Sequence, residues 1–364
     1  MHRIYRIHIE GAEQSMQHKY FAASNSAQGF KNYYPEVFAR ADHLYIIKGG
    51  PGTGKSSFMK KYARQAEADG LVCEYYYCSS DPSSLDGVLI HGKERIIGFL
   101  DGTAPHVSEP RFPGAREEIV NLGELWNTEL LVKQKNEIIA LSERKSAEYK
   151  SAYTFLRSVG NLRAVSDGLL EEVLDRAKLR SAVARLIKDL PSGKMSYIPS
   201  VLDSVSMSGR IRLDTFAKNA KKLYVVSDFY GVGQIFLTAL FEALKECEIF
   251  ARVSFDPVCS DRVDGIFLEK DRVAFVTERN SFVEGDEDGL RDVEIIQINS
   301  KRFVDVEGLR DIRSELRYTA RLAQSSLDGA LHSLSKAKIY HFLLEDIYGK
   351  TMDWKRFGEI DIKM

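Results

Sequence analysis

The sequence predicts an α/β protein built from two tandem copies of one domain, each a parallel-rich sheet flanked by helices. Two observations predict this class. A glycine-rich loop stands between a short apolar run and a helix-forming segment, and the pattern around this loop returns in the second half of the chain. The chain has 364 residues, which suffices for two domains of ordinary size.

Composition excludes several classes of protein. Hydrophobic residues make up 44% of the chain and charged residues 28%, and 51 basic side chains stand against 52 acidic ones. This balance argues against a disordered tail and against nucleic-acid binding. The chain has no run of 18 apolar residues, and its first residues lack the pattern of an export signal, so we expect a cytoplasmic protein with no membrane contact. Four cysteines without a CxxC pair indicate reduced thiols.

The glycine-rich loop at residues 49–56 matches G-x-x-x-x-G-K-[ST] in full. The apolar run 44–47 before it favours a strand, and residues 57–66 after it favour a helix, so strand, loop and helix follow in the order that a P-loop requires. The residues expected to bind a nucleotide are Gly49, Gly50, Pro51, Gly52, Thr53, Gly54, Lys55, Ser56 and Ser57.

Each residue type in this loop has a chemical reason. Glycines let backbone N–H groups turn inward around phosphates, at the positive end of the following helix. Lys55 can neutralise the outer phosphates, and the Ser56 hydroxyl can ligate Mg²⁺. No guanine-reading motif is present, so ATP is the default nucleotide and MgATP the expected cofactor.

A P-loop site also needs an acidic group near the metal. Asp101 closes the apolar run 95–100, at the carboxyl end of a predicted strand, and is the better candidate; Asp81, after the run 73–78, is the second. Ser56 and Asp101 are therefore the predicted metal ligands.

The identity of the catalytic base is open at this level. Gly102 follows Asp101, where hydrolytic P-loop motors commonly carry a glutamate. Water activation must then come from another group, such as Asp81, Asp86 or His106, or the acceptor is not water. The candidate catalytic residues are Lys55, Asp81, Asp101 and His106.

Two arginines follow in a segment rich in proline and glycine. Arg111 and Arg116 could place a cation on a transferred phosphate if this segment acted as a lid. The alternative is that both are ordinary surface arginines.

The second half repeats the first at offsets of 175–180 residues. Residues 222–237 align with 43–58, so that Gly233 lies 179 residues after Gly54. The pair Asp81-Pro82 aligns with 256–257 at an offset of 175, and further blocks follow in order. We interpret this as a tandem duplication whose halves pack as an intramolecular pseudo-dimer.

The second copy has lost the chemistry of the loop. Gln234 aligns with Lys55 and Ile235 with Ser56, and Asp228 and Phe229 replace the first two glycines. Glu278 aligns with Asp101. We therefore predict that the C-terminal half is a pseudo-domain that binds no nucleotide in the P-loop manner.

Each half ends in helical periodicity. Apolar positions recur from 137 to about 190, with Gly160-Asn161 as the turn of a helical hairpin, and again from 316 to 334. Residues 191–199 are the expected linker. The predicted domains are 1–194, with the intact loop and the hairpin, and 195–364. The fold class is thus α/β, with two tandem duplicated P-loop NTPase domains that each end in a helical extension.

Over nearly its whole length the sequence resembles a bacterial family, common in spore-forming Firmicutes, of tandem P-loop proteins described as ATPases or nucleotide-kinase-like. The resemblance rests on residues 49–56, 78–82, 85–87 and 101–106. It implies a P-loop fold and ATP binding, and it supplies no substrate. Members often keep a second intact loop, from which this chain departs at Gln234 and Ile235.

Three functions compete at this level. The leading one is an enzyme, a cytoplasmic ATPase that hydrolyses MgATP in its N-terminal half. The second is a phosphotransferase acting on a small-molecule or protein acceptor, which the missing glutamate after Asp101 favours. The third is a non-hydrolytic switch whose helices bind a protein partner according to nucleotide state.

Overall fold

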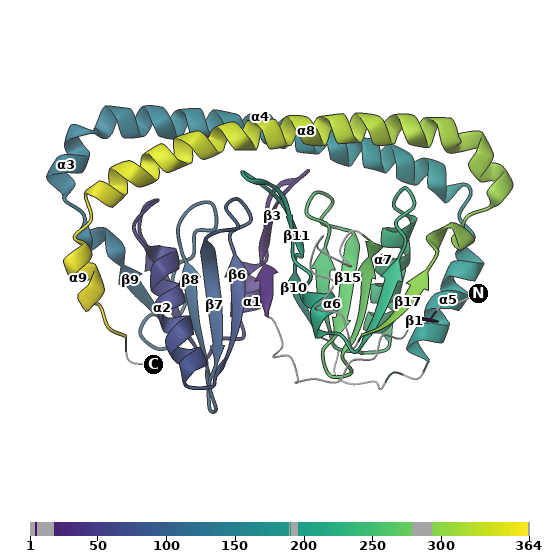
Figure 1. Cartoon of the computed structure of the whole chain (residues 1–364), viewed down its shortest axis with the longest axis horizontal. Helices are drawn as coiled ribbons and strands as arrows, with labels where there is room; N and C mark the ends of the chain where they lie inside the picture. Colours follow the sequence, from purple (N-terminus) through teal and green to yellow (C-terminus); the bar gives the residue numbers. More distant parts are fainter. Residues whose placement is uncertain (1–3, 6–17, 189, 191–195, 279–292, 363–364) are drawn as a thin grey trace.

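The computed structural model describes residues 4–5, 18–188, 190, 196–278 and 293–362. It consists of two α/β halves side by side, with two long helices lying across both (Figure 1). The predicted α/β class and the repetition of one architecture are confirmed. The identity of either half as a P-loop domain remains a prediction.

The sheet of the first half has six strands in the order β2-β6-β7-β8-β5-β9. Only β7 runs antiparallel to its neighbours. The strands are β2 (Lys19–Phe21), β5 (His43–Lys48), β6 (Val72–Tyr77), β7 (Leu85–His91), β8 (Ile96–Asp101) and β9 (Glu117–Asn121).

The sheet of the second half repeats this order and these directions as β10-β14-β15-β16-β13-β17. A short strand, β1 (Ile4–Tyr5), is added antiparallel to its edge at β17. The strands are β10 (Tyr197–Ser200), β13 (Lys222–Val226), β14 (Ala251–Phe255), β15 (Val263–Leu268), β16 (Val273–Thr277) and β17 (Glu294–Ile298).

Two kinds of helix cover each sheet. The short helices α1 (Tyr34–Phe38) and α6 (Thr215–Asn219) bury their apolar residues in one core that both halves share. The longer helices α2 (Lys55–Ala68) and α7 (Val232–Glu246) each pack on the other face, in a core of their own half. Two hairpins, β3 (Ala23–Ser26) with β4 (Gly29–Asn32) and β11 (Asp203–Ser206) with β12 (Gly209–Arg212), complete the repeat.

A pseudo-twofold axis relates the two halves. Phe21 and Val201 hold equivalent places at the ends of β2 and β10, and each donates its backbone N–H to the carbonyl of the other, at 3.0 and 2.9 Å. The edges of the two sheets therefore meet at this pair.

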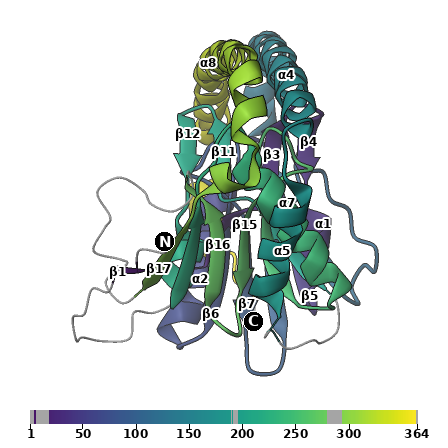
Figure 2. The same ribbon diagram turned by 90° about the vertical axis from the view of Figure 1, so that its right-hand side faces the viewer.

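The helical extension of each half crosses to the other half. After η1 (Leu122–Leu125) and α3 (Thr128–Lys133), α4 spans Lys135–Glu171 and lies along α8 (Val306–Lys350), which follows η4 (Ser300–Phe303). Helix α5 (Arg176–Ile187) then packs on α7 in the second half. Helix α9 (Trp354–Glu359) packs against the apolar core of the first half, which also contains the buried face of α2 (Figure 1). Figure 2 shows α4 and α8 together above the sheets.

Equivalent backbone hydrogen bonds fix both crossings. Asp353 donates its N–H to the carbonyl of Leu125 at 2.9 Å, and Asp175, 178 residues earlier than Asp353, donates to the carbonyl of Phe303 at 2.8 Å. The two extensions, which we call the arms (residues 122–188 and 300–362), are thus exchanged between the halves. Nothing in the apolar periodicity of either arm predicts which half it covers.

The predicted turn at Gly160-Asn161 is wrong, because α4 runs through both residues without a break. A Cβ atom on Gly160 would lie 2.6 Å from the Cβ of Ala27, on the hairpin below the helix. Glycine at this position therefore permits a close approach between α4 and the first half, and it does not mark a hairpin of helices.

Two further sequence predictions have mixed outcomes. Residues 191–195 of the expected linker lie outside the described residues, whereas Tyr197–Ser200 forms β10, so the linker does not extend to Pro199. The four cysteines are free thiols. Among the described helices, none combines the length and the apolar character needed to cross a bilayer.

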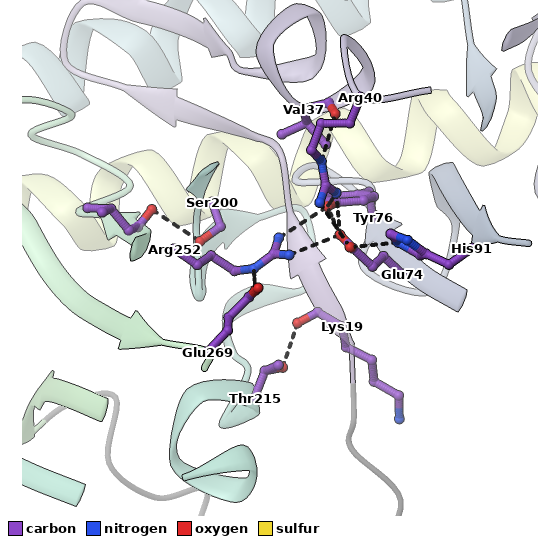
Figure 3. A network of polar contacts seen from close by, with 11 residues as sticks. Lys19, Val37, Arg40, Glu74, Tyr76, His91, Ser200, Thr215, Arg252 and Glu269 are labelled. Carbon is purple, nitrogen blue, oxygen red and sulfur yellow. Dashed lines mark hydrogen bonds and ion pairs between the residues drawn. The ribbon is translucent and has the colours of Figure 1, made fainter. Parts of the chain in front are cut away.

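A buried polar network joins the halves next to the pseudo-twofold axis (Figure 3). Glu74 on β6 accepts hydrogen bonds from Arg252 on β14 at 3.2 Å and from Arg40 at 3.1 Å, and His91 lies 2.8 Å from its other side. Arg252 also pairs with Glu269 at 2.7 Å. Burial would raise the pKa of Glu74, but the charges and hydrogen bonds of Arg252, His91 and Arg40 hold it well below its usual range.

Candidate functional site

The glycine loop, residues 49–57, joins the carboxyl end of β5 to the first turn of α2. Gly52 and Gly54 have φ angles of 69° and 82°, in the left-handed region that glycine adopts at little cost. Gly54 is the residue before α2, and no side chain caps this end of the helix. Backbone amides at an uncapped helix N-terminus after such a glycine turn are groups that can bind an anion.

Lys55 folds back over this loop. Its Nζ donates to the carbonyl oxygens of Gly50 at 2.7 Å and Gly49 at 3.1 Å, and it lies 3.6 Å from Oδ2 of Asp101. The ammonium group and this carboxylate are both largely buried. The structure therefore brings together the predicted lysine and the preferred metal aspartate.

Strand pairing explains why Asp101 lies there. β8 is the parallel neighbour of β5, and Asp101 pairs with Ile47 near the end of that strand. Its Oδ1 accepts hydrogen bonds from the backbone and hydroxyl of Thr103, which leaves Oδ2 toward Lys55. The Ser56 hydroxyl accepts from the backbone N–H of Leu85 at 2.9 Å, so it is held at the start of β7.

His106 lies behind Asp101 in a buried cluster. One ring nitrogen is 2.9 Å from the carbonyl of Asp101 and the other 3.1 Å from Oδ2 of Asp86, which also accepts the hydroxyl of Tyr34 at 3.0 Å. Burial would lower the pKa of His106, but the hydrogen bond and charge of Asp86, with the charge of Asp101, raise it above its usual value. His106 therefore connects the end of β8, at Asp101, with Asp86 on β7.

The other charged candidates have local partners. Oδ1 of Asp81 accepts from the backbone and hydroxyl of Ser83, as in an Asx turn. Arg116 donates to the carbonyls of Ala41 and Phe38 beside the start of β9, which is the end of the sheet opposite the glycine loop, so its proposed role on a phosphate is wrong. Arg111 stacks over its neighbour Phe112.

The arm of the second half covers the glycine loop. A Cβ atom on Gly52 would lie 2.8 Å from the Cα of Glu345 on α8, and one on Gly54 would lie 2.9 Å from the ring of Phe357 on α9. These glycines are therefore required twice, for their φ angles and for the close approach of the arm. The sequence predicted only the first of these requirements.

Two charged residues on the arms, Glu345 and Lys145, interact electrostatically with Lys55 and could not be predicted from the sequence. A hydrogen bond with His341 lowers the pKa of Glu345, and the charge of Lys55 and the amide of Gly52 lower it further, against the effect of burial. Burial lowers the pKa of Lys145 on α4, where the charge of Glu345 raises it and that of Lys55 lowers it. A carboxylate and a second ammonium group thus interact with Lys55. Neither residue belongs to a local sequence motif, because each arm contacts the loop only through the tertiary fold.

The second half lacks these groups at the equivalent places. On the strands that correspond to β5 and β8, Val226 pairs with Thr277, just as Ile47 pairs with Asp101. The predicted equivalence of Glu278 with Asp101 is therefore off by one residue, because the hairpin between β15 and β16 is shorter. The second half therefore has an uncharged residue, Thr277, at the position of Asp101.

Two other alignments also change when equivalent contacts are compared. The buried faces of α2 and α7 match at an offset of 178, from Phe58 with Phe236 onward, which puts Gln234 at the place of Ser56. After β14, the N–H of Asp256 bonds the carbonyl of residue 262 just as the N–H of Cys78 bonds that of residue 84. Asp256 therefore corresponds to Cys78 and not to Asp81. The loss of the lysine and the hydroxyl from the second loop is unaffected.

Comparisons of the chain with protein-family models, with curated proteins and with solved structures found no match. The geometry of the glycine loop and of the arms above it is therefore the ground on which a function can be proposed.

Proposed function

We propose that this chain is a P-loop NTPase that binds MgATP in its first half and hydrolyses it there. The observation that carries the proposal is the convergence of Lys55 and Asp101 at 3.6 Å beside a loop with two left-handed glycines at an uncapped helix N-terminus. Backbone amides and a lysine supply positive charge for phosphates, and the adjacent carboxylate suits a phosphate-bound cation.

Different residues of the loop and of β8 would bind the phosphates and the metal. The loop amides would cradle the phosphates, and Lys55 would leave the carbonyls of Gly49 and Gly50 to bind the outer ones. Mg²⁺ prefers oxygen donors, so the Ser56 hydroxyl and the Asp101 carboxylate are a chemically fitting pair to hold it. When bound, the metal would offset the charge that develops on the transferred phosphoryl group.

The second half serves this site through its arm. Glu345 and the ring of Phe357 lie against the loop, so the arm would cover the site and shield it from water. Lys145 on α4 adds a cation that could face the terminal phosphate. We propose that the second half has a regulatory or scaffolding role and binds no nucleotide in the P-loop manner.

Two alternative activities share this binding step. A phosphotransferase would pass the phosphoryl group to a hydroxyl acceptor, and it is favoured by the local hydrogen bonds that occupy Asp81, which leave no positioned base for water there. A non-hydrolytic switch is favoured by the contact of Glu345 with Gly52, because bound phosphate and the arm would compete for the loop.

Steady-state phosphate release and MgATP binding test the proposal on wild type and two lysine variants. Lys55→Ala should lower phosphate release at least roughly a hundredfold, because it removes charge that acts on the transition state. Lys60→Ala is the matched control, because Lys60 is on the same helix, is half-buried and donates an exposed hydrogen bond to the carbonyl of Ser83; it should keep wild-type rates. Absence of MgATP binding in the wild type, or an unchanged Lys55→Ala variant, would refute the proposal.

The same assay separates the alternatives. Turnover that rises only when a metabolite is added, with a phosphorylated product, indicates a phosphotransferase. Tight MgATP binding without turnover over hours indicates the switch.

A further inference from the structure

A cavity of about 480 Å³ lies in the second half, beneath the crossing arms. It occupies the region that corresponds to the glycine loop of the first half: Asp228 and Gly231, from the loop between β13 and α7, line it, together with residues of α4 and α8. A cavity of this size accommodates a small metabolite.

Four guanidinium groups line this cavity and come from three parts of the chain. Arg163 is on α4, Arg210 and Arg212 are on β12, and Arg262 directly precedes β15. Two acidic residues, Asp228 and Glu278, also belong to the lining. The lining therefore has four basic and two acidic side chains. Carboxylates behind the lining pair with the arginines, so the wall offers N–H donors and no net positive charge.

Carboxylates behind the wall hold the arginines in place. Arg163 bonds Asp256 at 2.8 Å, and Arg210 bonds Asp203 at 2.7 Å. Arg262 pairs with Asp167 and also donates to the side-chain oxygen of Gln234 at 3.4 Å. Asp203 and Asp256 are each 1% exposed. A guanidinium group has five N–H donors, so one that is fixed along one edge keeps donors for a ligand on its other edge. This arrangement is typical of preorganised sites for phosphate or carboxylate.

The arginines are specific to the second half. Strand register places Phe30 and Asn32 of β4 at the positions of Arg210 and Arg212. At the common offset of 178 residues, His341 stands at the position of Arg163 and Ser84 at that of Arg262. The half that lost the lysine and the hydroxyl of the loop therefore has guanidinium groups where the other half has uncharged or weakly basic side chains.

We propose that this cavity binds a small phosphorylated metabolite, with the arginines on its phosphate and with Asp228 and Glu278 accepting hydrogen bonds from its hydroxyl groups. Guanidinium groups match phosphate oxygens in geometry as well as in charge. The site goes beyond the proposed ATPase function and does not depend on it. It takes its phosphate through arginine side chains and needs neither a glycine loop nor a metal.

The test uses the full-length Lys55→Ala protein, in which the glycine loop has lost its lysine, and ribose 5-phosphate as the probe with ribose as the neutral control. Isothermal titration calorimetry should show saturable binding of ribose 5-phosphate and no binding of ribose. Because the measurement is made in the Lys55→Ala background, it stands whether or not the wild type binds ATP.

Two further substitutions identify the site. Arg262→Gln should weaken binding roughly 10- to 100-fold, because a hydrogen bond to a charged group is lost. Its partner Asp167 is 39% exposed, so water reaches one side of the carboxylate that loses its pair, although Oδ1 is buried. Gln324→Glu places a negative charge on the cavity wall, leaves every arginine pair intact, and should also weaken binding. Arg176→Gln, which removes an exposed pair with Glu171, is the control.

The expected result is weaker binding in both cavity variants, with unfolding midpoints close to that of the parent. The proposal is overturned if ribose 5-phosphate does not bind saturably, if ribose binds equally well, or if the two cavity variants bind as tightly as the Arg176→Gln control.

Discussion

Glu345 places a carboxylate against the loop that we propose for phosphates. Its pKa is lowered by His341, by Lys55 and by the amide of Gly52, so it is an anion at neutral pH, and bound phosphate must compete with it. We therefore expect Glu345→Gln to tighten MgATP binding by roughly three- to tenfold, since a competing charge is removed.

The matched control for this prediction is Glu315→Gln, at an exposed position of the same helix. Equilibrium binding of a fluorescent ATP analogue measures both variants. Weaker binding in Glu345→Gln would show instead that the carboxylate assists the nucleotide.

His106 makes a pH-dependent contribution to stability. Its pKa is raised in the folded protein, so the stabilisation is fully present below the unfolded value of about 6.5 and is lost as pH rises through the folded value. His106→Asn should cost about 1–3 kcal/mol of unfolding free energy at pH 5.5, with a smaller cost at pH 8.5. Urea unfolding at both pH values checks this, with exposed His332→Asn as control. A cost that grows with pH would contradict the assignment.

At the scale of elements, Gly160 and Gly168 lie on the same helix, α4, but only Gly160 is closely packed against another part of the chain. A Cβ on Gly160 would meet Ala27 at 2.6 Å, whereas a Cβ on Gly168 would meet nothing within 4 Å. Gly168→Ala should therefore stabilise the protein by up to about 1 kcal/mol through helix propensity. Gly160→Ala should destabilise it by about 1–3 kcal/mol, because α4 must move away from the hairpin.

Chemical unfolding of the two alanine variants, made in the same background, compares them directly. Equal and favourable effects of both substitutions would mean that the contact with Ala27 does not constrain α4.

The elements that could be predicted from sequence are those with local causes. The strand before the glycine loop, the helix after it and the strand that ends at Asp101 follow from apolar runs and from the loop motif itself. Gly160 could not be interpreted correctly, because a glycine needed for close packing and a glycine at a turn look alike in one sequence. The register of Thr277 was missed because it depends on a hairpin length that apolar patterning does not specify.

For the whole molecule, the repeat offset predicted two related halves, and the structure confirms them. The exchange of arms could not be predicted, because an apolar stripe on a helix does not indicate which sheet buries it. For the same reason Lys145 and Glu345 were absent from the predicted site. Their approach to Lys55 depends on tertiary crossing over more than 80 residues of chain.

The network at the axis should contribute to the association of the halves as a coupled unit. Removing one partner of a buried pair leaves the other charge uncompensated, so Glu74→Gln and Arg252→Gln should each cost about 3–5 kcal/mol. The double variant should cost less than the sum of the two. Because the pKa of Glu74 is lowered on folding, its stabilisation is present above its unfolded pKa and lost as pH falls through the folded value.

A double-mutant cycle in urea at pH 7 measures this coupling. The cycle of Arg176 and Glu171, an exposed pair, serves as the control and should give under about 1 kcal/mol. Additive costs at Glu74 and Arg252 would show that the two side chains are stabilised separately.

Strand register places Glu74 and Arg252 at the same point of their respective sheets: Glu74 pairs with Leu89, and Arg252 pairs with Phe267, which lie 178 residues further along in each case. A homodimer of either half alone would put two identical side chains there, two carboxylates or two guanidinium groups, and they would repel. A chain that carries two diverged copies can place opposite charges next to its own pseudo-twofold axis. Fusion of the copies thus permits an asymmetric centre, and the same asymmetry separates a half with a glycine loop beside Lys55 and Asp101 from a half with an arginine-lined cavity.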